Sequence, residues 1–307
     1  MKIMVTGGAG FIGSHIVNEY INAGHEVVII DDLSTGEMRF VNPKAIFYQL
    51  NIHSPDVKTI LEKEKISAIN HHAAQISVSE SVSDPLFDAN SNIIGTLQLL
   101  RNAVSLNINK FVFASTGGAM YGEQTIFPAS EEHPCRPLSP YGISKLCAEY
   151  YINYFRTQHG LNTTVLRYSN VYGPHQNPHG EAGVVAIFCQ RLMEGLPPVI
   201  FGDGEQTRDF ISVRDVAQAN IIALDSKCMG TFNIGTGKET SVNFLTKKLL
   251  KVSGITTSSK HSPPKKGEQR RSSIDSKKLL ESFGWKPCIS LEEGLFETIN
   301  YFKNKTT

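Results

Sequence analysis

Two residues of the segment YGISK carry side chains that could together move a proton. Tyr141 and Lys145 stand four residues apart, a spacing that puts both on one face of a helix. A free tyrosine has a pKa near ~10 and is a poor base at neutral pH. A neighbouring ammonium group favours the phenolate and lowers that pKa, so the pair could take a proton from a substrate hydroxyl. Surface pairs share this spacing, and the rest of the chain must distinguish the two cases.

A glycine-rich stretch near the start of the chain predicts a phosphate-binding loop. Gly7, Gly10 and Gly13 follow a short apolar run and precede an amphipathic helical pattern over residues 11–20. Glycines in this setting let the backbone pass close to a pyrophosphate and point a helix N-terminus at it. The stretch therefore indicates a dinucleotide cofactor.

The end of the second apolar run identifies which dinucleotide is expected. Asp31 and Asp32 lie at the distance from the glycines where a carboxylate accepts hydrogen bonds from the adenosine ribose. A carboxylate repels a 2′-phosphate, so we expect NAD and not NADP. Beside NAD, Tyr141 would take a hydroxyl proton while hydride leaves the same carbon for the nicotinamide. The positive charge of oxidised nicotinamide would also favour the phenolate.

Strands and helices alternate through the first half of the chain. Short apolar runs predict six strands, at residues 3–7, 25–31, 45–50, 67–74, 110–116 and 163–173. Continuous apolar strands separated by helical patterns imply a parallel sheet buried on both faces. We therefore expect an α/β fold with a doubly wound parallel-sheet Rossmann domain.

The character of the sequence changes after Gly173, where loops rich in Gly, Pro and His begin. The helical pattern SVRDVAQANIIAL, at residues 212–224, predicts a return to the first domain. We expect an NAD-binding domain of residues 1–173 and about 212–237. A smaller mixed α/β substrate domain would comprise about 174–211 and 238–307.

The composition excludes several classes of function. The 307 residues are 40% hydrophobic and 19% charged, and the formal net charge of +1 gives no general attraction to nucleic acid or anionic membranes. No stretch reaches the ~18 apolar residues of a membrane helix, and none of signal-peptide length precedes the glycines. Five scattered cysteines predict reduced thiols, and the histidines lack metal-ligand spacing. We expect a cytoplasmic protein without a metal.

Motifs along nearly the whole chain resemble, in order, the NAD-dependent sugar-nucleotide epimerase/dehydratase family of extended short-chain dehydrogenases/reductases. These motifs are TGGAGFIGS, DDLSTG, HHAAQISVSESVSDP, NIIGT, SPYGISK, LRYSNVYGP, GDGEQTRDF, FNIGTG and FGWKP. The resemblance implies tightly bound NAD, a UDP-sugar substrate, and catalysis by Tyr141 and Lys145. It also implies a homodimer formed through the helices that carry Asn92 and Tyr141.

The resemblance further implies two sets of binding residues. The expected cofactor contacts are Gly7, Gly10, Phe11, Ile12, Gly13, Asp31, Asp32, Asn51, Ile52, Ala73, Ala74, Gln75, Asn92, Tyr141, Lys145 and Tyr168. The expected substrate contacts are Ser77, Thr116, Tyr141, Asn170, Val184, Val199, Phe201, Arg208, Arg271 and Ser272. Arg208 has a physical reason of its own, because a guanidinium can bind two phosphate oxygens at once.

The chain departs from the family pattern at the third catalytic group. The family has Ser or Thr at a position that Gly117 occupies here. We expect Thr116 to supply the hydroxyl, with Ser115 as the alternative; successive strand residues face opposite sides, so the two are not equivalent. Asn51 replaces the usual aspartate beside adenine and can still accept from its amino group.

A second departure lies in the basic loop KKGEQRRS. Lys265 and Glu268 stand where the family has an arginine and a Gly-Asp pair. Arg270 or Arg271 would compensate for them.

The residues after the strand hydroxyl narrow the expected reaction. Dehydratases of the family carry an Asp-Glu pair and decarboxylases a glutamate where this chain has Gly118 and Ala119. Without those carboxylates, the resemblance implies reversible C4 epimerisation of a UDP-hexose, UDP-glucose or UDP-galactose. Ser272 resembles a position that limits pocket size, and its small side chain would also admit N-acetyl sugars.

Three alternatives remain open at this point. A UDP-glucuronate 4-epimerase could use the loop from His175 to Glu181 to hold the sugar carboxylate. Another nucleotide-sugar epimerase or dehydratase has the same fold. A catalytically silent NAD-binding regulator would explain Gly117, although the intact Tyr141 and Lys145 argue against it.

Overall fold

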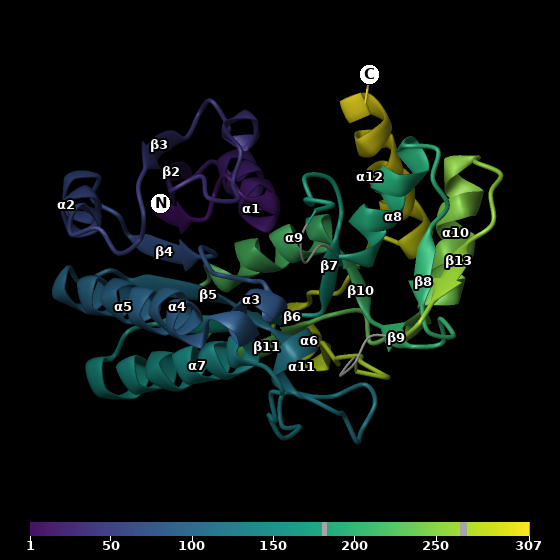
Figure 1. Cartoon of the computed structure of the whole chain (residues 1–307). Coiled ribbons are helices and arrows are strands. Elements are labelled where there is room, and N and C mark those ends of the chain that lie inside the picture. The colour runs from purple at the N-terminus through teal and green to yellow at the C-terminus, as the bar shows by residue number, and fades with distance from the viewer. Residues whose placement is uncertain (180–182, 265–268, 307) are drawn as a thin grey trace.

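The computed structural model describes residues 1–179, 183–264 and 269–306. Its central feature is a seven-stranded sheet, parallel throughout, in the order β11-β6-β5-β4-β1-β2-β3 (Figure 1). The strands are β1 (Lys2–Thr6), β2 (Glu26–Asp31), β3 (Ile46–Gln49), β4 (Ala68–His71), β5 (Lys110–Thr116), β6 (Thr163–Tyr168) and β11 (Gly230–Ile234). The strand order reverses at β1, as in a doubly wound Rossmann fold, and confirms the predicted fold class.

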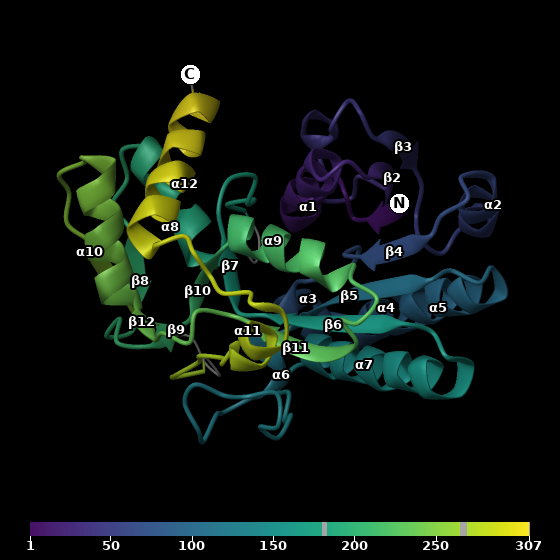
Figure 2. The same ribbon diagram turned by 180° about the vertical axis from the view of Figure 1, so that it is seen from behind.

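Helices cover both faces of this sheet (Figures 1 and 2). On one face, α1 (Phe11–Asn22) packs against α9 (Val213–Ala223). On the other lie α2 (Asp56–Lys63), α5 (Gly95–Ser105) and α7 (Pro140–His159). Strand β1 shows why both faces are apolar: Ile3 and Val5 join the α1–α9 core, and Met4 between them joins the opposite core.

A chain of short helices precedes α5 and lies against α7. It consists of α3 (Val78–Ser83), α4 (Pro85–Ala89) and the π-helix η2 (Asn90–Ile94), which continues into α5. Ser77 caps α3 and Asp84 caps α4 through their side chains. Asn92 of η2 then forms hydrogen bonds with Gln75, which follows the carboxyl end of β4.

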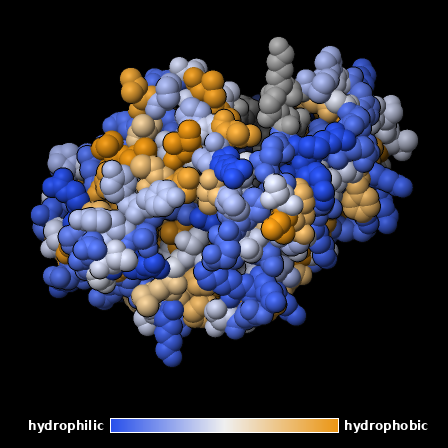
Figure 3. Space-filling model, turned by 90° about the horizontal axis from the view of Figure 1, so that it is seen from below, coloured by the Kyte–Doolittle hydropathy of each residue, from blue (hydrophilic) through white to orange (hydrophobic). Residues whose placement is uncertain are grey.

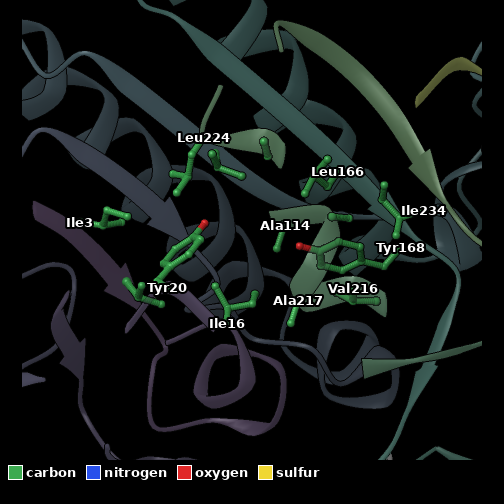
Figure 4. Packing of buried hydrophobic residues seen from close by; sticks show 14 of the residues in the cluster. Ile3, Ile16, Tyr20, Ala114, Leu166, Tyr168, Val216, Ala217, Leu224 and Ile234 are labelled. Carbon is green, nitrogen blue, oxygen red and sulfur yellow. The ribbon is translucent and has the colours of Figure 1, made fainter. Parts of the chain in front are cut away.

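The core between α1, α9 and the sheet contains two tyrosines among aliphatic side chains. In Figure 4 the hydroxyls of Tyr20 and Tyr168 point toward each other, and Ala114 lies beside the Tyr168 hydroxyl. Asn70 donates to the Tyr20 hydroxyl at 2.5 Å, and Asn220 donates to the Tyr168 hydroxyl at 2.9 Å. The hydroxyls are buried with partners, as polar groups in a core must be.

The predicted sixth strand is too long. The structure ends β6 at Tyr168 and begins β7 (Asn170–Tyr172) in a separate pair with β10 (Phe210–Ser212). The reason is a change of partner, because the Ser169 amide still bonds to Ile234 of β11 whereas the Asn170 amide bonds to Asp209. The chain leaves the large sheet at this point and enters the second domain.

The second domain contains strand pairs and three longer helices, which fits the mixed α/β class that the sequence predicted. Besides β7–β10, it contains the pairs β8 (Val199–Phe201) with β13 (Lys260–Ser262) and β9 (Thr207–Arg208) with β12 (Thr240–Ser241). The helices α8 (Val184–Met193), α10 (Val242–Ser253) and α12 (Leu291–Thr306) share a separate apolar core. The shorter α11 (Lys277–Phe283) instead packs on β11 of the large sheet, through Leu279 among others. The predicted domain ranges stay a prediction.

Candidate active site

The N-terminal turn of α7 presents the tyrosine and lysine that the sequence singled out. Ser139 caps the helix by accepting a hydrogen bond from the Gly142 amide at 3.2 Å, and Pro140 occupies its first turn. Tyr141 lines a cavity that also contains residues from the glycine loop and from the second domain. Lys145 is buried below it, donating to the Ala114 carbonyl at 3.1 Å. Its ammonium also lies 4.7 Å from the centre of the Phe113 ring.

Burial opposes the charged form of both residues. It raises the pKa of Tyr141, and the nearby Asp88 carboxylate raises it further. Burial lowers the pKa of Lys145 to about 8, against the opposing effect of the Asp88 and Glu149 carboxylates. Lys145 therefore remains cationic at neutral pH, but the protein alone keeps Tyr141 protonated. The phenolate expected from the spacing of the pair requires a further positive charge in the cavity.

The two candidate hydroxyls differ in their surroundings. Ser115 is buried and donates to Glu149 at 2.6 Å, so its proton is already engaged. Thr116 ends β5 at the cavity wall, and its hydroxyl accepts from the Ala119 amide at 3.2 Å. A Cβ at Gly117 would lie 2.6 Å from Cδ1 of Ile274, so a side chain at this position would displace the end of the Ile274 side chain. Thr116 as the third catalytic group stays a prediction.

The cavity lies between the sheet and the second domain and has a volume of about 480 Å³. It brings together Tyr141, Thr116 and Tyr168 of the first domain with Asn170, Val184, Val199, Phe201 and Arg208 of the second. Sequence reasoning missed Gln176, which also lines the cavity. The buried side-chain oxygens of Ser169, Asn170 and Gln176 have no hydrogen-bond partner among the described residues. A polar ligand in the cavity would satisfy them.

The glycine loop between β1 and α1 has the geometry of an anion cradle. Gly7 adopts φ +70°, and a Cβ there would lie 2.7 Å from the Ala73 amide nitrogen. Gly10 begins α1 with no side-chain cap, leaving the first-turn amides for a ligand. Phe11 and Ile12 of that turn line the cavity. The loop therefore fits the pyrophosphate of a dinucleotide.

The two aspartates at the end of β2 have different partners. Asp31 is buried and accepts from the amides of Ala9 and Leu33, both at 2.9 Å, which fixes the glycine loop. Asp32 is exposed and accepts from the Asn51 side chain at 2.7 Å. A carboxylate has room for further donors, so either aspartate can still receive ribose hydroxyls. Asn51 acts here as a donor to Asp32, which adds to the acceptor role expected beside adenine.

The segment after β4 is held by side chains of η2. The Gln75 amide donates to Asn92 at 3.1 Å, and Asn92 donates back to the Gln75 carbonyl at 2.9 Å. Ala73 packs against the Gly7 loop. These contacts carry Ala73, Ala74 and Gln75 past the glycine loop, where the sequence expects the cofactor.

Three predicted substrate residues lie outside the described lining of the cavity. Ser77 caps α3 beside Ile76, which does line it. Arg271 pairs with Glu239 and lies 3.8 Å over the Phe127 ring. Ser272 is buried, with 2% of its surface exposed.

Arg270, one of the two arginines expected to compensate for Lys265 and Glu268, has an acidic partner. Arg270 pairs with Asp203 through both terminal nitrogens, at 2.8 and 2.9 Å. Lys265 and Glu268 lie outside the described residues, as does Glu181.

In residues 1–179, 183–264 and 269–306, no group of three or more His, Cys, Asp or Glu side chains could hold a metal ion. None of the helices in these ranges combines the length and hydropathy needed to cross a bilayer.

Comparisons with known proteins agree with this geometry. The profile of the NAD dependent epimerase/dehydratase family matches residues 3–235. The chain is 41% identical, over the full length of both, to UDP-glucose 4-epimerase of Mycolicibacterium smegmatis. Among solved structures, it is similar to the Thermotoga maritima UDP-glucose 4-epimerase with UDP-glucose, with 46% identity, TM-score 0.96 and all of each chain covered. It also resembles the Thermus thermophilus UDP-glucose 4-epimerase complex with NAD, with 39% identity, TM-score 0.94 and 99% of each covered.

Proposed function

The chain belongs to the NAD dependent epimerase/dehydratase family and is an NAD-dependent nucleotide-sugar 4-epimerase, and we propose that it interconverts UDP-glucose and UDP-galactose. The observation that carries this proposal is the shared cavity. Tyr141 and Thr116 line it beside the glycine-loop residues Phe11 and Ile12, and Arg208 lies in the same lining. A proton acceptor, a cofactor cradle and a phosphate-binding cation thus open into one space.

Each residue of the site has its own part in the proposed reaction. Tyr141 accepts the proton of the C4 hydroxyl and later returns it, with Thr116 hydrogen-bonded to the same oxygen. Bound NAD would supply the hydride acceptor for C4 and a positive charge that favours the Tyr141 phenolate. Lys145 adds the second positive charge. The sugar must rotate between the loss and the return of its C4 hydrogen. The protein must therefore bind the nucleotide tightly and the sugar weakly.

Firm binding of the nucleotide falls to the second domain. We assign the diphosphate to Arg208 and to the N-terminus of α8 at Val184, because a guanidinium and helix amides both bind phosphate oxygens. Asn170 and the apolar residues Val199 and Phe201 line the same cavity. The oxygens of Ser169 and Gln176 supply further acceptors.

The residues beside Thr116 support epimerisation over dehydration. Gly118 and Ala119 have no acidic group to remove a hydroxyl elsewhere on the sugar. The rival UDP-glucuronate reaction needs a polar or basic group for the sugar carboxylate, and a basic group would come from His175 in the loop named above. His175 is a poor candidate, since burial lowers its pKa to about 4 and its ring stacks on Phe40 at 4.0 Å between centroids.

We also propose that the enzyme accepts N-acetylated UDP-hexoses, on the small size of Ser272. Ser272 is buried and does not belong to the described lining, so a tyrosine there would act by displacing the segments packed around it. Ser272→Tyr should reduce turnover of UDP-N-acetylgalactosamine more than that of UDP-galactose. Equal loss of both activities would contradict this part of the proposal.

The assembly is proposed to be a homodimer formed by α7 and the helices before α5. Figure 3 views the molecule from the side of α7 and shows hydrophobic side chains gathered over one half of that face. The exposed apolar and aromatic residues on these helices include Val82, Leu86, Phe87, Ile94, Ile143, Tyr150 and Tyr154. Light scattering should give a dimer for the wild type and a monomer for Leu86→Lys. A monomeric wild type would exclude the assembly.

The cellular location is proposed to be the cytoplasm. The support is that each of the five cysteines is a thiol without a disulfide partner. Fractionation of cells that express the protein from its own promoter would test the assignment.

An NMR assay tests the reaction directly. Purified protein is incubated separately with UDP-galactose, UDP-N-acetylgalactosamine and UDP-glucuronate, and the C4 epimer is measured. Tyr141→Phe should lower kcat by about 10²- to 10⁴-fold, the usual contribution of a general base. Tyr151→Phe is the matched control, because Tyr151 lies on the same helix, is 40% exposed and is not among the residues assigned to the dimer interface. Turnover of none of the three sugars would refute the proposed function.

A further inference from the structure

Asp88 is a buried carboxylate close to the reacting residues for which the proposed chemistry has no use. It lies on α4 with no exposed surface. Burying an ionised carboxylate is costly unless hydrogen bonds and opposite charge compensate it. Its position therefore calls for a reason beyond packing.

Three neutral donors converge on Asp88 from three different segments. Gln75 and Asn92 donate side-chain N–H groups to Oδ1 at 3.0 and 2.9 Å, and the Ser144 hydroxyl lies 2.6 Å from Oδ2. All three donors are buried. This is the donor set of an ionised carboxylate, which only accepts.

These contacts connect the parts of the site that must act together. Gln75 belongs to the segment beside the glycine loop, and Asn92 belongs to η2. Ser144 lies on α7 between Tyr141 and Lys145. A single side chain thus fixes the helix of the proton-transfer pair against the cofactor segment.

The charge of Asp88 also acts on that pair. It raises the pKa of Tyr141 and that of Lys145, in each case in addition to the larger effect of burial. Glu149 acts on Lys145 in the same direction, but it is paired with Arg167 at 2.7 Å. In the described chain, the hydrogen bonds to the Asp88 side chain come from neutral groups. The cation that its negative charge stabilises is therefore Lys145.

The other charged or titratable groups around this site do not replace that role. On the sheet side, His71 and His72 are buried, and burial together with Lys145 lowers the pKa of both. On α3, Glu80 is exposed to solvent. The π-helix η2 contains no titratable residue.

We propose that Asp88 is a positioning residue for the reaction: its carboxylate locks α7 to the Gln75 segment and supplies the negative charge that balances buried, cationic Lys145. This inference rests on the proposed function for its kinetic consequence only. It predicts that the charge of Asp88 determines the pH range in which Tyr141 can lose its proton while Lys145 keeps its own.

The decisive variant is Asp88→Asn, which keeps the shape and removes the charge. The amide oxygen can still accept from Gln75 and Asn92, and the Ser144 hydroxyl can rotate to accept from the new amide. Without the negative charge, Tyr141 deprotonates at lower pH and Lys145 also loses its proton at lower pH. Both limbs of the pH profile of kcat/KM for UDP-galactose should therefore move down together, by on the order of 1 pH unit.

Ser144→Ala is the matched control for a purely mechanical role. It removes the hydrogen bond to α7 but keeps the carboxylate, so the rate should fall with both limbs in place. If Asp88→Asn likewise lowers the rate without moving either limb, the assigned charge role is wrong.

A readout independent of turnover separates this inference from the proposed function. The Tyr141 resonance of the ¹³Cζ-tyrosine-labelled holoenzyme, identified by its loss in Tyr141→Phe, should titrate at lower pH in Asp88→Asn. This shift without turnover of any sugar would refute the function and support the role of Asp88. An unchanged titration in an active enzyme would overturn the role of Asp88 alone.

A double-mutant cycle covers the case in which Asp88→Asn folds poorly. Lys145→Met leaves the carboxylate without its cation, and adding Asp88→Asn removes that imbalance. The double variant should therefore have a higher Tm than the sum of the single shifts predicts. Additive shifts would overturn the proposed charge balance.

Discussion

Two buried polar clusters lie on opposite faces of the large sheet, and they are built from different chemistry. The neutral cluster, on the α1–α9 face, consists of Tyr20, Asn70, Tyr168 and Asn220. The charged cluster, on the α7 face, consists of Asp88, Lys145, Glu149 and Arg167. Both clusters are buried, and both include a residue at the end of β6, Tyr168 in the neutral cluster and Arg167 in the charged one. Depth of burial therefore does not distinguish them.

The neutral cluster joins helices to the sheet by ordinary hydrogen bonds. Asn70 of β4 donates to Tyr20 of α1 and, at 2.9 Å, to Asn220 of α9. Burial raises the pKa of both tyrosines, so neither ionises in the working pH range. Such a cluster fixes the docking of α1 and α9 without depending on pH.

The charged cluster lies where the reaction needs charge. Lys145 is cationic beneath Tyr141, and the two carboxylates favour that state. The ion pair between Glu149 and Arg167 also engages Ser115 and Tyr121. The comparison teaches that polar burial on one face joins helices to the sheet, whereas on the other it places charges beside the proposed proton-transfer pair.

The largest stability effect should come from breaking the buried ion pair. Arg167→Met leaves Glu149 as an uncompensated buried charge, which should reduce the free energy of unfolding by about 3–5 kcal/mol in chemical denaturation. The double variant Arg167→Met with Glu149→Gln should recover much of that loss. If the single variant were as stable as wild type, Glu149 would not need Arg167 to compensate its buried charge.

Lys145 should make stability depend on alkaline pH. Its folded pKa of about 8 lies below its value of 10.5 in the unfolded chain, so the unfolded chain binds more protons between these values. The contribution of Lys145 to stability therefore rises with pH across that window, by up to about 3 kcal/mol. The unfolding free energy of wild type minus that of Lys145→Met should increase from pH 8 to 10.5. A flat difference would mean that Lys145 is not desolvated.

The neutral cluster should respond to mutation in stability only. Asn220→Ala removes the partner of Asn70 and Tyr168 and should cost about 1–3 kcal/mol, because buried polar groups are left unmatched. The pH limbs of kcat/KM should stay in place, in contrast to Asp88→Asn. A shifted limb would show that the two faces are coupled through the sheet.

The smallest effect is expected at Tyr20. Tyr20→Phe removes one acceptor of Asn70, which keeps its bond to Asn220, so the loss should be about 1 kcal/mol. Thermal denaturation at two pH values should give the same shift at each. A much larger loss would mean that the hydroxyl organises the whole cluster.

Local patterns in the sequence carried the fold class and the types of residue at the site. The glycine spacing, the apolar runs and the pair Tyr141–Lys145 each depend on neighbours within a few residues, where helix and strand geometry is regular. They predicted the doubly wound sheet, and they named Tyr141, which shares a cavity with Thr116 and Arg208. The roles of those side chains remain predictions until the variants are measured.

Only the tertiary structure decided which partners those residues have. Ser115 and Glu149 are 34 residues apart, and Asp88 and Ser144 are 56 residues apart. Ser115 was therefore an open alternative to Thr116 in the sequence, Asp88 gave no signal, and the end of β6 was misplaced. Spacing along the chain describes which face of an element a residue occupies. The packing of distant elements decides whether that face meets a carboxylate, a cation or a cavity. For this reason the pKa of Tyr141 depends on Asp88, which is far from it in the sequence.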